Sequence, residues 1–217
     1  MSLKIEQVHK YFVGEVSGID LSDPLSKSEV IQIEEGMDQF GVLIFREQFL
    51  SDEEQVSYTK NFGELELHVG SNVLKGNERR LSLEFADVSN LDQDGEILKK
   101  GDRRRMFNLG NRLWHTDSSF RNIPSKFSIL SCRSSPKVGG NTEFSFMPAV
   151  YDELDEGTKQ EIADLITEHS LIYSRGQLGF SDFNEEEKQM FKPVQHVMVR
   201  INAVSYTHLT LPTIREV

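Results

Sequence analysis

The chain has 217 residues, 37% of them hydrophobic and 27% charged, a composition typical of one globular domain with a continuous core. Its 24 basic and 35 acidic residues give a net charge of -11, which argues against nucleic acid or an anionic membrane surface as the main partner. The single cysteine, Cys132, excludes an internal disulfide and a cysteine-based zinc site. With no apolar signal core and no run long enough to span a bilayer, we expect a cytoplasmic protein.

Two helix-start signals stand in the N-terminal third. Ser26 and Glu29 have the spacing of a capping box, apolar residues follow at helical intervals, and Gly41 supplies a stop. Ser51 and Glu54 repeat the capping-box spacing further along the chain. The sequence therefore predicts two helices in this region.

Short apolar runs predict strands elsewhere. The run VLIF at 42–45 indicates a buried strand, and similar runs alternate with turn residues from about 80 to 147, which predicts a sheet-rich middle. Residues 151–167 carry apolar positions among many carboxylates and predict an amphipathic helical segment. The run QHVMVRIN at 195–202 returns to the pattern of a strand.

The run LWHTDSSF at 113–120 places a histidine and an aspartate two positions apart. If this run is extended, His115 and Asp117 point to the same face, where both side chains can reach one metal ion, and Trp114 packs in the core. One imidazole and one carboxylate, joined by a distant second histidine, form the facial triad that suits Fe(II). A hydrogen-bonded strand histidine explains the same spacing, so spacing alone leaves both interpretations open.

Several separated motifs occur in the order typical of one family. They resemble the taurine and 2,4-dichlorophenoxyacetate dioxygenase (TauD/TfdA) family from about residue 10 to about residue 203, and DVSN, LWHTDSSF and YSRGQLGFSDF are closer to its phenoxyacetate branch. The motifs are FREQFLSDEEQVSYTKNFGELELH (45–68), DVSN (87–90), LWHTDSSF (113–120), GGNTEF (139–144) and KPVQHVMVR (192–200).

The resemblance implies a mainly β fold with flanking helices, a double-stranded β-helix or jelly-roll, incomplete at the C-terminus. It places a partial dioxygenase domain at residues 1–203. The segment VSYTHLTLPTIREV at 204–217 resembles a translated sequencing adapter, so we expect a non-native tail. The family's second iron histidine and its 2-oxoglutarate arginine are expected beyond this chain, so the chain as written is expected to be inactive and poorly folded.

The resemblance also implies a reaction and the residues that carry it. An Fe(II)- and 2-oxoglutarate-dependent dioxygenase uses dioxygen to hydroxylate a small organic anion, aryloxyacetate-like or sulfonate-like, and releases succinate and CO2. His115 and Asp117 correspond to the first two iron ligands. Thr142, after GGN, corresponds to a hydroxyl that binds the distal carboxylate of 2-oxoglutarate. His68 and Asn90 correspond to positions that face the substrate.

Other interpretations stay open at these positions. Thr142 also fits a turn residue that satisfies its own backbone, and His68 and Asn90 also fit ordinary loop residues. A non-catalytic jelly-roll binding module and a zinc hydrolase using the His-x-Asp pair are the rival functions, and a homo-oligomer is left open. A basic cluster precedes the His-x-Asp run and suits either a solvated loop or a surface that attracts an anionic substrate. It comprises Lys99, Lys100, Arg103, Arg104 and Arg105.

Overall fold

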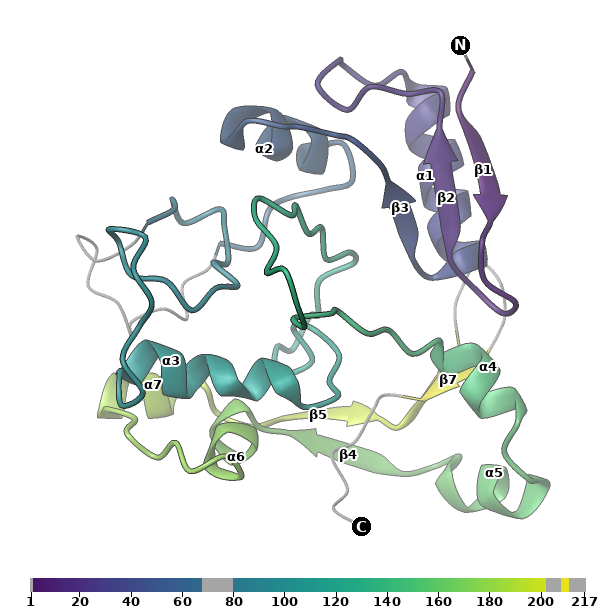
Figure 1. Cartoon of the computed structure of the whole chain (residues 1–217). Helices are drawn as coiled ribbons and strands as arrows, with labels where there is room; N and C mark the ends of the chain where they lie inside the picture. Colours follow the sequence, from purple (N-terminus) through teal and green to yellow (C-terminus); the bar gives the residue numbers. More distant parts are fainter. Residues whose placement is uncertain (1, 68–79, 202–207, 211–217) are drawn as a thin grey trace. The chain divides into compact units, whose positions relative to one another are not determined.

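The computed structural model describes residues 2–67, 80–201 and 208–210, and these form two compact parts (Figure 1). The first part comprises Met1–Leu65, Ile129–Ile162 and Val199–Thr210. The described residues of the second part lie within Glu66–Ser128 and Ala163–Met198. Each part is assembled from segments far apart in the sequence, so neither corresponds to one continuous stretch of chain.

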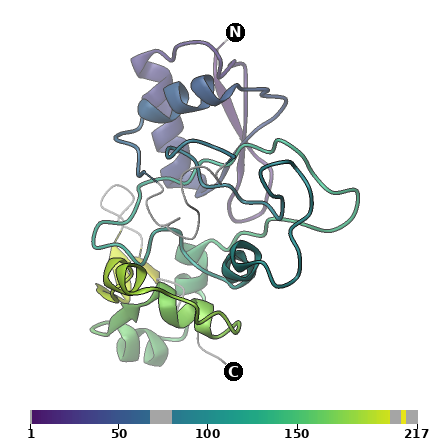
Figure 2. The same ribbon diagram turned by 90° about the vertical axis from the view of Figure 1, so that its left-hand side faces the viewer.

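A three-stranded sheet organises the start of the first part. Strand β1 (Lys4–Gln7) pairs antiparallel with β2 (Gly14–Ser17), and β2 pairs in parallel with β3 (Leu43–Phe45). Helix α1 (Lys27–Phe40) links the parallel strands and lies against one face of the sheet (Figures 1 and 2). This is the connection that parallel strands require, because a tight turn cannot join them.

Both predicted capping boxes are present. The Ser26 hydroxyl accepts a hydrogen bond from the Glu29 amide at 3.3 Å, and the Glu29 carboxylate accepts one from the Ser26 amide at 2.8 Å. Helix α1 ends at Gly41, whose φ of 66° is in the left-handed region that favours glycine. Helix α2 (Asp52–Lys60) begins after the second box. These local signals predicted both helices correctly.

The remaining elements of the first part lie near the end of the described chain. Helices α4 (Met147–Asp152) and α5 (Glu156–Ile162) are short, and β6 (Val199–Ile201) pairs antiparallel with β7 (His208–Thr210). The helical segment predicted at 151–167 is therefore correct as far as Ile162, with a break between α4 and α5, and wrong at its end, where the chain becomes a strand from Ile166. A core packs beneath the sheet, formed by Leu3, Val16, Leu21, Ile33 and Tyr58.

Two antiparallel strands and short helices make up the second part. Strand β4 (Ile166–His169) pairs with β5 (Val194–Val197). The strand predicted at 195–202 is confirmed in part, because the chain breaks at Met198 into β5 and β6. The helical elements are α3 (Arg103–Asn108), the 3-10 helix η2 (Leu109–Arg112), α6 (Leu171–Gly176) and α7 (Glu185–Met190). The core of this part consists of Leu171, Phe180, Phe183 and Phe191.

The sheet-rich middle predicted at 80–147 is wrong for the residues that the structure describes there. The segment holds α3, η2 and the first residues of α4, and its β pairing is an isolated bridge between Leu91 and Ile97. A strand needs a hydrogen-bonded neighbour as well as alternating apolar residues, and the sequence pattern reports only the second condition. Among the described residues, no helix is long and apolar enough to cross a membrane.

Candidate metal centre

The His-x-Asp run leaves the end of η2 as a turn. Leu113 is extended, with φ -84° and ψ 145°, and the residues from Asp117 onward form a turn in which Ser118 has a φ of 55°. A positive φ is uncommon outside glycine, and it reverses the chain directly after the aspartate. The expectation of a strand at 113–120 is therefore wrong, although the turn also brings the two polar side chains together.

The His115 imidazole and the Asp117 carboxylate are in direct contact. His115 Nε2 lies 3.1 Å from Asp117 Oδ1, and His115 Nδ1 lies 2.6 Å from the Leu113 carbonyl oxygen. The two side chains are 39% and 55% exposed, so a ligand from solvent can reach them. Each ring nitrogen of His115 therefore has a defined contact.

These contacts fix which nitrogen of His115 is free to bind a cation. A carbonyl oxygen only accepts hydrogen bonds, so Nδ1 carries the proton that is donated to Leu113, and in the neutral ring Nε2 presents a lone pair to Asp117. Two acceptors facing each other at 3.1 Å need a positive charge between them. That charge is either a second proton on the imidazole or a metal ion.

The spacing of the two atoms also suits a shared metal ion. Metal–ligand bonds of about 2.0–2.2 Å set neighbouring octahedral ligands roughly 3 Å apart. The observed 3.1 Å separation of Nε2 and Oδ1 meets this condition without rearrangement. Backbone bonding of the opposite ring nitrogen is the usual support for a metal-binding histidine. The pair therefore fits two neighbouring positions of an iron site.

The contact between the two side chains shifts both of their pKa values. The hydrogen bond to Asp117 raises the pKa of His115, against the opposing effects of burial and the charge of Arg175. The hydrogen bond with His115 lowers the pKa of Asp117 despite its burial, and Ser128 adds to this effect. Both shifts have the sign expected when a positive charge lies between Nε2 and Oδ1, and a bound metal ion would supply that charge in place of a proton.

The Glu66 side chain stabilises the turn that follows Asp117. Its carboxylate accepts a hydrogen bond from the Ser118 hydroxyl at 2.7 Å, one from the Ser125 hydroxyl, and one from Arg121 Nε at 3.1 Å. Because these donors lie at both ends of the turn, the Glu66 carboxylate links the two ends. This contact is what holds Ser118 in its uncommon backbone conformation.

His196 holds the same turn from strand β5. Its Nε2 lies 3.0 Å from the carbonyl oxygens of both Ser119 and Arg121, so its proton is shared between them. The His196 ring is buried and meets the His169 ring edge to face, with centroids 5.3 Å apart. The turn beyond Asp117 is therefore anchored to the sheet of the second part, which fixes the position of the carboxylate.

The Glu66 contacts predict a specific dependence of stability on pH. Partial burial by itself raises the pKa of Glu66, but hydrogen bonds from Ser125 and Ser118 and the charge of Arg121 outweigh it, so that pKa lies below its usual 4.5. A depressed carboxyl pKa contributes stability that is present above the unfolded-state value and is lost as pH falls through the folded-state value. We therefore expect Glu66→Gln to lower the free energy of unfolding at neutral pH and to flatten its decline below about pH 4.5.

Urea unfolding between about pH 3 and pH 7 measures this dependence. The exposed neighbour Glu64 provides the control, and Glu64→Gln is expected to keep the acid limb of the parent. An unchanged acid limb in Glu66→Gln would show that the carboxylate does not stabilise the turn.

The other predicted site residues lie elsewhere. Asn90 is exposed in the same part as the His-x-Asp pair, and its backbone carbonyl accepts a hydrogen bond from the Leu98 amide at 2.8 Å. Thr142 is exposed in the first part, after Gly139 and Gly140, whose φ values are 74° and 73°. His68 lies outside the described residues. Of the predicted residues that the structure describes, His115 and Asp117 are in contact.

Trp114, which the sequence analysis places in the core, is exposed. Trp114 is 57% exposed beside His115, and Cys132 is also exposed. Trp114 is exposed because the run forms a turn and not a strand, so there is no buried sheet face against which this side chain could pack.

The basic cluster is not simply a solvated loop. Arg103 pairs with Glu187 at 2.7 Å, and Arg104 pairs with Asp102 at 2.8 Å.

Within the residues that the structure describes, no group of three or more His, Cys, Asp and Glu side chains is arranged to hold a metal ion. His115 and Asp117 supply two ligands. The sequence did not predict the roles of Glu66 and His196, because no spacing links them to the pair. Only the tertiary contacts identify them.

Comparison with known proteins supplies the wider context. The family described as "Taurine catabolism dioxygenase TauD, TfdA family" matches residues 4–215. An alpha-ketoglutarate-dependent 2,4-dichlorophenoxyacetate dioxygenase of Burkholderia sp. (strain RASC) is 38% identical over 208 residues, which cover 94% of this chain and 69% of the relative. The enzyme of the same name from Cupriavidus pinatubonensis is also 38% identical over 208 residues, and the match covers 71% of that enzyme.

A solved structure is similar as well. The crystal structure of AAD-2 in complex with Mn(II) and N-oxalylglycine has a TM-score of 0.92 and 50% identity, and the match covers 97% of this chain and 73% of that one. The phenoxyacetate relatives agree with the branch that the motifs indicated. The chain belongs to the TauD/TfdA dioxygenase family.

Proposed function

We propose that this protein is an Fe(II)- and 2-oxoglutarate-dependent dioxygenase that hydroxylates a small aryloxyacetate-like anion and releases succinate and CO2. The contact between His115 Nε2 and Asp117 Oδ1 carries the proposal, because it offers a nitrogen and an oxygen at the spacing of two iron ligands. Membership of the TauD/TfdA family and the names of its 2,4-dichlorophenoxyacetate relatives support the same reaction.

Different residues of the chain would bind the metal, the co-substrate and the substrate. His115 and Asp117 would hold Fe(II), which supplies the activation of dioxygen when it is bound. The Leu113 carbonyl orients the imidazole, and the turn closed by Glu66 keeps the carboxylate in place. Thr142 would donate a hydrogen bond to the distal carboxylate of 2-oxoglutarate, while Asn90 and His68 would face the substrate.

The test is the formation of succinate from 2-oxoglutarate by the purified protein, completed with the sequence of its source gene beyond residue 203. Succinate is expected to require added Fe(II) and to increase with aryloxyacetates and, more weakly, with sulfonates. Neutral esters matched to these anions are expected to give no increase. No Fe(II)-dependent succinate with any member of the panel would overturn the proposal, and preference for the esters would overturn the anionic substrate.

We further propose a jelly-roll for the catalytic domain, formed by residues 1–203, with 204–217 as a non-native tail. The high structural similarity to AAD-2 supports the fold. The family match extends to residue 215, and β7 lies within the proposed tail. Resequencing the source gene past residue 203 tests whether the tail is native. If the gene itself encodes residues 204–217, the segment is native and this part of the proposal is overturned.

Thr142 gives a separate prediction about the co-substrate. Thr142→Val keeps the shape of the side chain and removes its hydroxyl, and a hydrogen bond to a charged group contributes about 1.5–3 kcal/mol. The apparent affinity for 2-oxoglutarate is therefore expected to fall roughly tenfold or more. Titration of the Fe(II)-loaded protein measures it. Ser135→Ala removes an exposed hydroxyl from the same part and is expected to leave the affinity unchanged, and equal affinities for all three proteins would make Thr142 a turn residue.

A further inference from the structure

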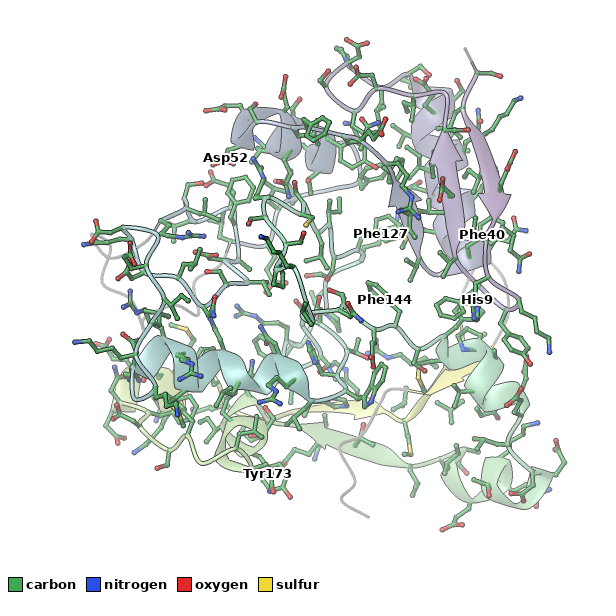
Figure 3. The ribbon with its side chains drawn as sticks, viewed as in Figure 1. His9, Phe40, Asp52, Phe127, Phe144 and Tyr173 are labelled. Carbon is green, nitrogen blue, oxygen red and sulfur yellow. The ribbon has the colours of Figure 1, made fainter. Side chains whose placement is uncertain are left out.

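Arg175 places a guanidinium beside the helix that leads to His115. It lies on α6, where Tyr173 is on the exposed side (Figure 3), and its own side chain turns toward η2. The guanidinium carbon lies 5.0 Å from the centroid of the Phe107 ring. A Cβ built on Gly110 would lie 2.0 Å from Arg175 Nη1, so the group packs directly on the backbone of η2.

This guanidinium has only weak neutral partners. Arg175 Nη2 lies 3.3 Å from Asn111 Oδ1, and Nη1 lies 3.4 Å from the Ser174 hydroxyl, both near the outer limit for a hydrogen bond. Its Nε is buried and has no hydrogen-bond partner among the described residues. Nor does any carboxylate of the described chain come within ion-pair distance of it. Arg103, Arg104 and Arg121, in contrast, each pair with a carboxylate of the same part.

Such an arrangement is costly unless a ligand completes it. Burial lowers the pKa of Arg175, which reflects the loss of water around a charge that has no counter-ion in the described chain. Arginine nevertheless stays protonated in proteins, so the charge persists. An incoming anion would therefore gain two forked N–H donors in surroundings where water competes weakly.

The guanidinium also lies close to the segment that carries the metal pair. Its Nη2 is 3.3 Å from Oδ1 of Asn111 in η2, and the chain continues from η2 through Leu113 into His115, four residues after Asn111. An anion held by Arg175 would thus lie on the His115 side of the candidate metal centre. This is where a substrate must lie if it is to react at a metal bound there.

We infer that Arg175 is a substrate-binding residue whose guanidinium takes the carboxylate of the aryloxyacetate-like substrate beside the metal pair. The inference rests on the proposed function for the identity of the anion. It assigns the substrate carboxylate, and not 2-oxoglutarate, because the proposed partner of 2-oxoglutarate is Thr142. The planar guanidinium suits a carboxylate, which it can bind through two parallel hydrogen bonds.

Binding is tested without turnover, by the fluorescence of the single tryptophan, Trp114, which neighbours His115. The full chain with Fe(II) under anaerobic conditions is titrated with 2,4-dichlorophenoxyacetate and with its neutral amide. Arg175→Gln is expected to weaken binding of the carboxylate at least about tenfold and to leave the amide within about twofold. Arg175→Lys should restore part of the lost affinity. The exposed Arg112 is the charge-matched control, and Arg112→Gln is expected to bind like the parent.

Gly110→Ala moves the guanidinium without removing its charge. The new methyl group would meet Nη1, Cζ and Nε of Arg175 at 2.0–2.3 Å, and these atoms form the end of a flexible side chain that can shift. We expect weaker carboxylate binding with nearly unchanged thermal unfolding. This variant keeps the inference testable if Arg175→Gln does not fold.

The outcomes separate this inference from the proposed function. Loss of carboxylate binding in Arg175→Gln and Gly110→Ala supports the anion site even if no succinate is formed, in which case the proposed function alone fails. Equal loss of carboxylate and amide binding would make Arg175 structural and overturn the inference. Unchanged carboxylate binding in either variant, or a raised Kd for 2-oxoglutarate in place of the carboxylate, would also overturn it.

Discussion

In the protein completed from its source gene, Asp117→Ala is expected to abolish Fe(II)-dependent succinate formation. The substitution removes the anionic partner that lies 3.1 Å from His115 Nε2, so a metal ion would keep one ligand of the pair. Loss of residues that only support a ligand already costs about 10- to 100-fold in metal affinity, and loss of the ligand itself should cost more than that. Calorimetric titration with Fe(II) under anaerobic conditions measures the affinity, and succinate measures the activity.

Two further variants make the Asp117 result specific. Asp117→Asn keeps the shape of the side chain without its charge, and we expect a large loss of metal affinity with near-parental unfolding. Asp94 is an exposed aspartate in the same part, and Asp94→Ala is expected to bind metal like the parent. Parental metal affinity and succinate formation in Asp117→Ala would end the assignment of this residue as a ligand.

The elements that the sequence predicted well are those whose signals are local. The capping boxes before α1 and α2 lie within four residues of chain, and Gly41 ends its helix through its own backbone conformation. Each of these interactions forms wherever the chain turns into a helix, without help from distant segments. This is why both helices begin within a residue of their predicted starts.

The run at 113–120 shows where local signals are insufficient. Its composition predicts a strand, but the turn is stabilised by Glu66 and His196, which lie 52 and 77 residues away from Ser118 and Ser119. A local pattern of apolar and polar residues cannot predict hydrogen bonds between residues so far apart in the sequence. The His-x-Asp contact was nevertheless predicted, because two residues separated by one are neighbours both in a strand and in this turn.

Arg103 shows the same dependence on distant partners within the basic cluster. A run of positive charge ordinarily faces solvent, and the sequence offers no sign that Glu187 will be buried 84 residues further on. Helix α7 provides the partner: its capping box bends the Glu187 carboxylate back to the Asn184 amide, where Arg103 reaches it. The charge run is therefore partly a structural link between α3 and α7.

This link leads to the largest expected change in stability. Glu187 is 0% exposed, and its Oε2 accepts hydrogen bonds from Arg103 Nη2 at 2.7 Å and from the Asn184 amide at 2.8 Å. Glu187→Ala removes the side-chain half of the capping box that Glu187 supplies, and among the described residues it leaves the Arg103 charge with only the exposed Asp182 as an ionic partner. Breaking a buried ion pair from one side typically costs about 3–5 kcal/mol. We expect a loss of this size in the free energy of unfolding, measured by urea denaturation with a cooperative transition.

Matched variants separate the buried charge from the other effects of changing α7. Glu186 is exposed on the same helix, and Glu186→Ala is expected to change the free energy of unfolding by no more than about 0.5 kcal/mol. Glu187→Gln keeps the volume and can still accept from the Asn184 amide, so it should fall between Glu187→Ala and the parent. Because Arg103 begins the helix that leads through η2 to His115, Glu187→Ala should also weaken Fe(II) binding, whereas Glu186→Ala should not. Equal unfolding free energies for the Glu186 and Glu187 alanine variants would show that the buried pair contributes nothing beyond an exposed one.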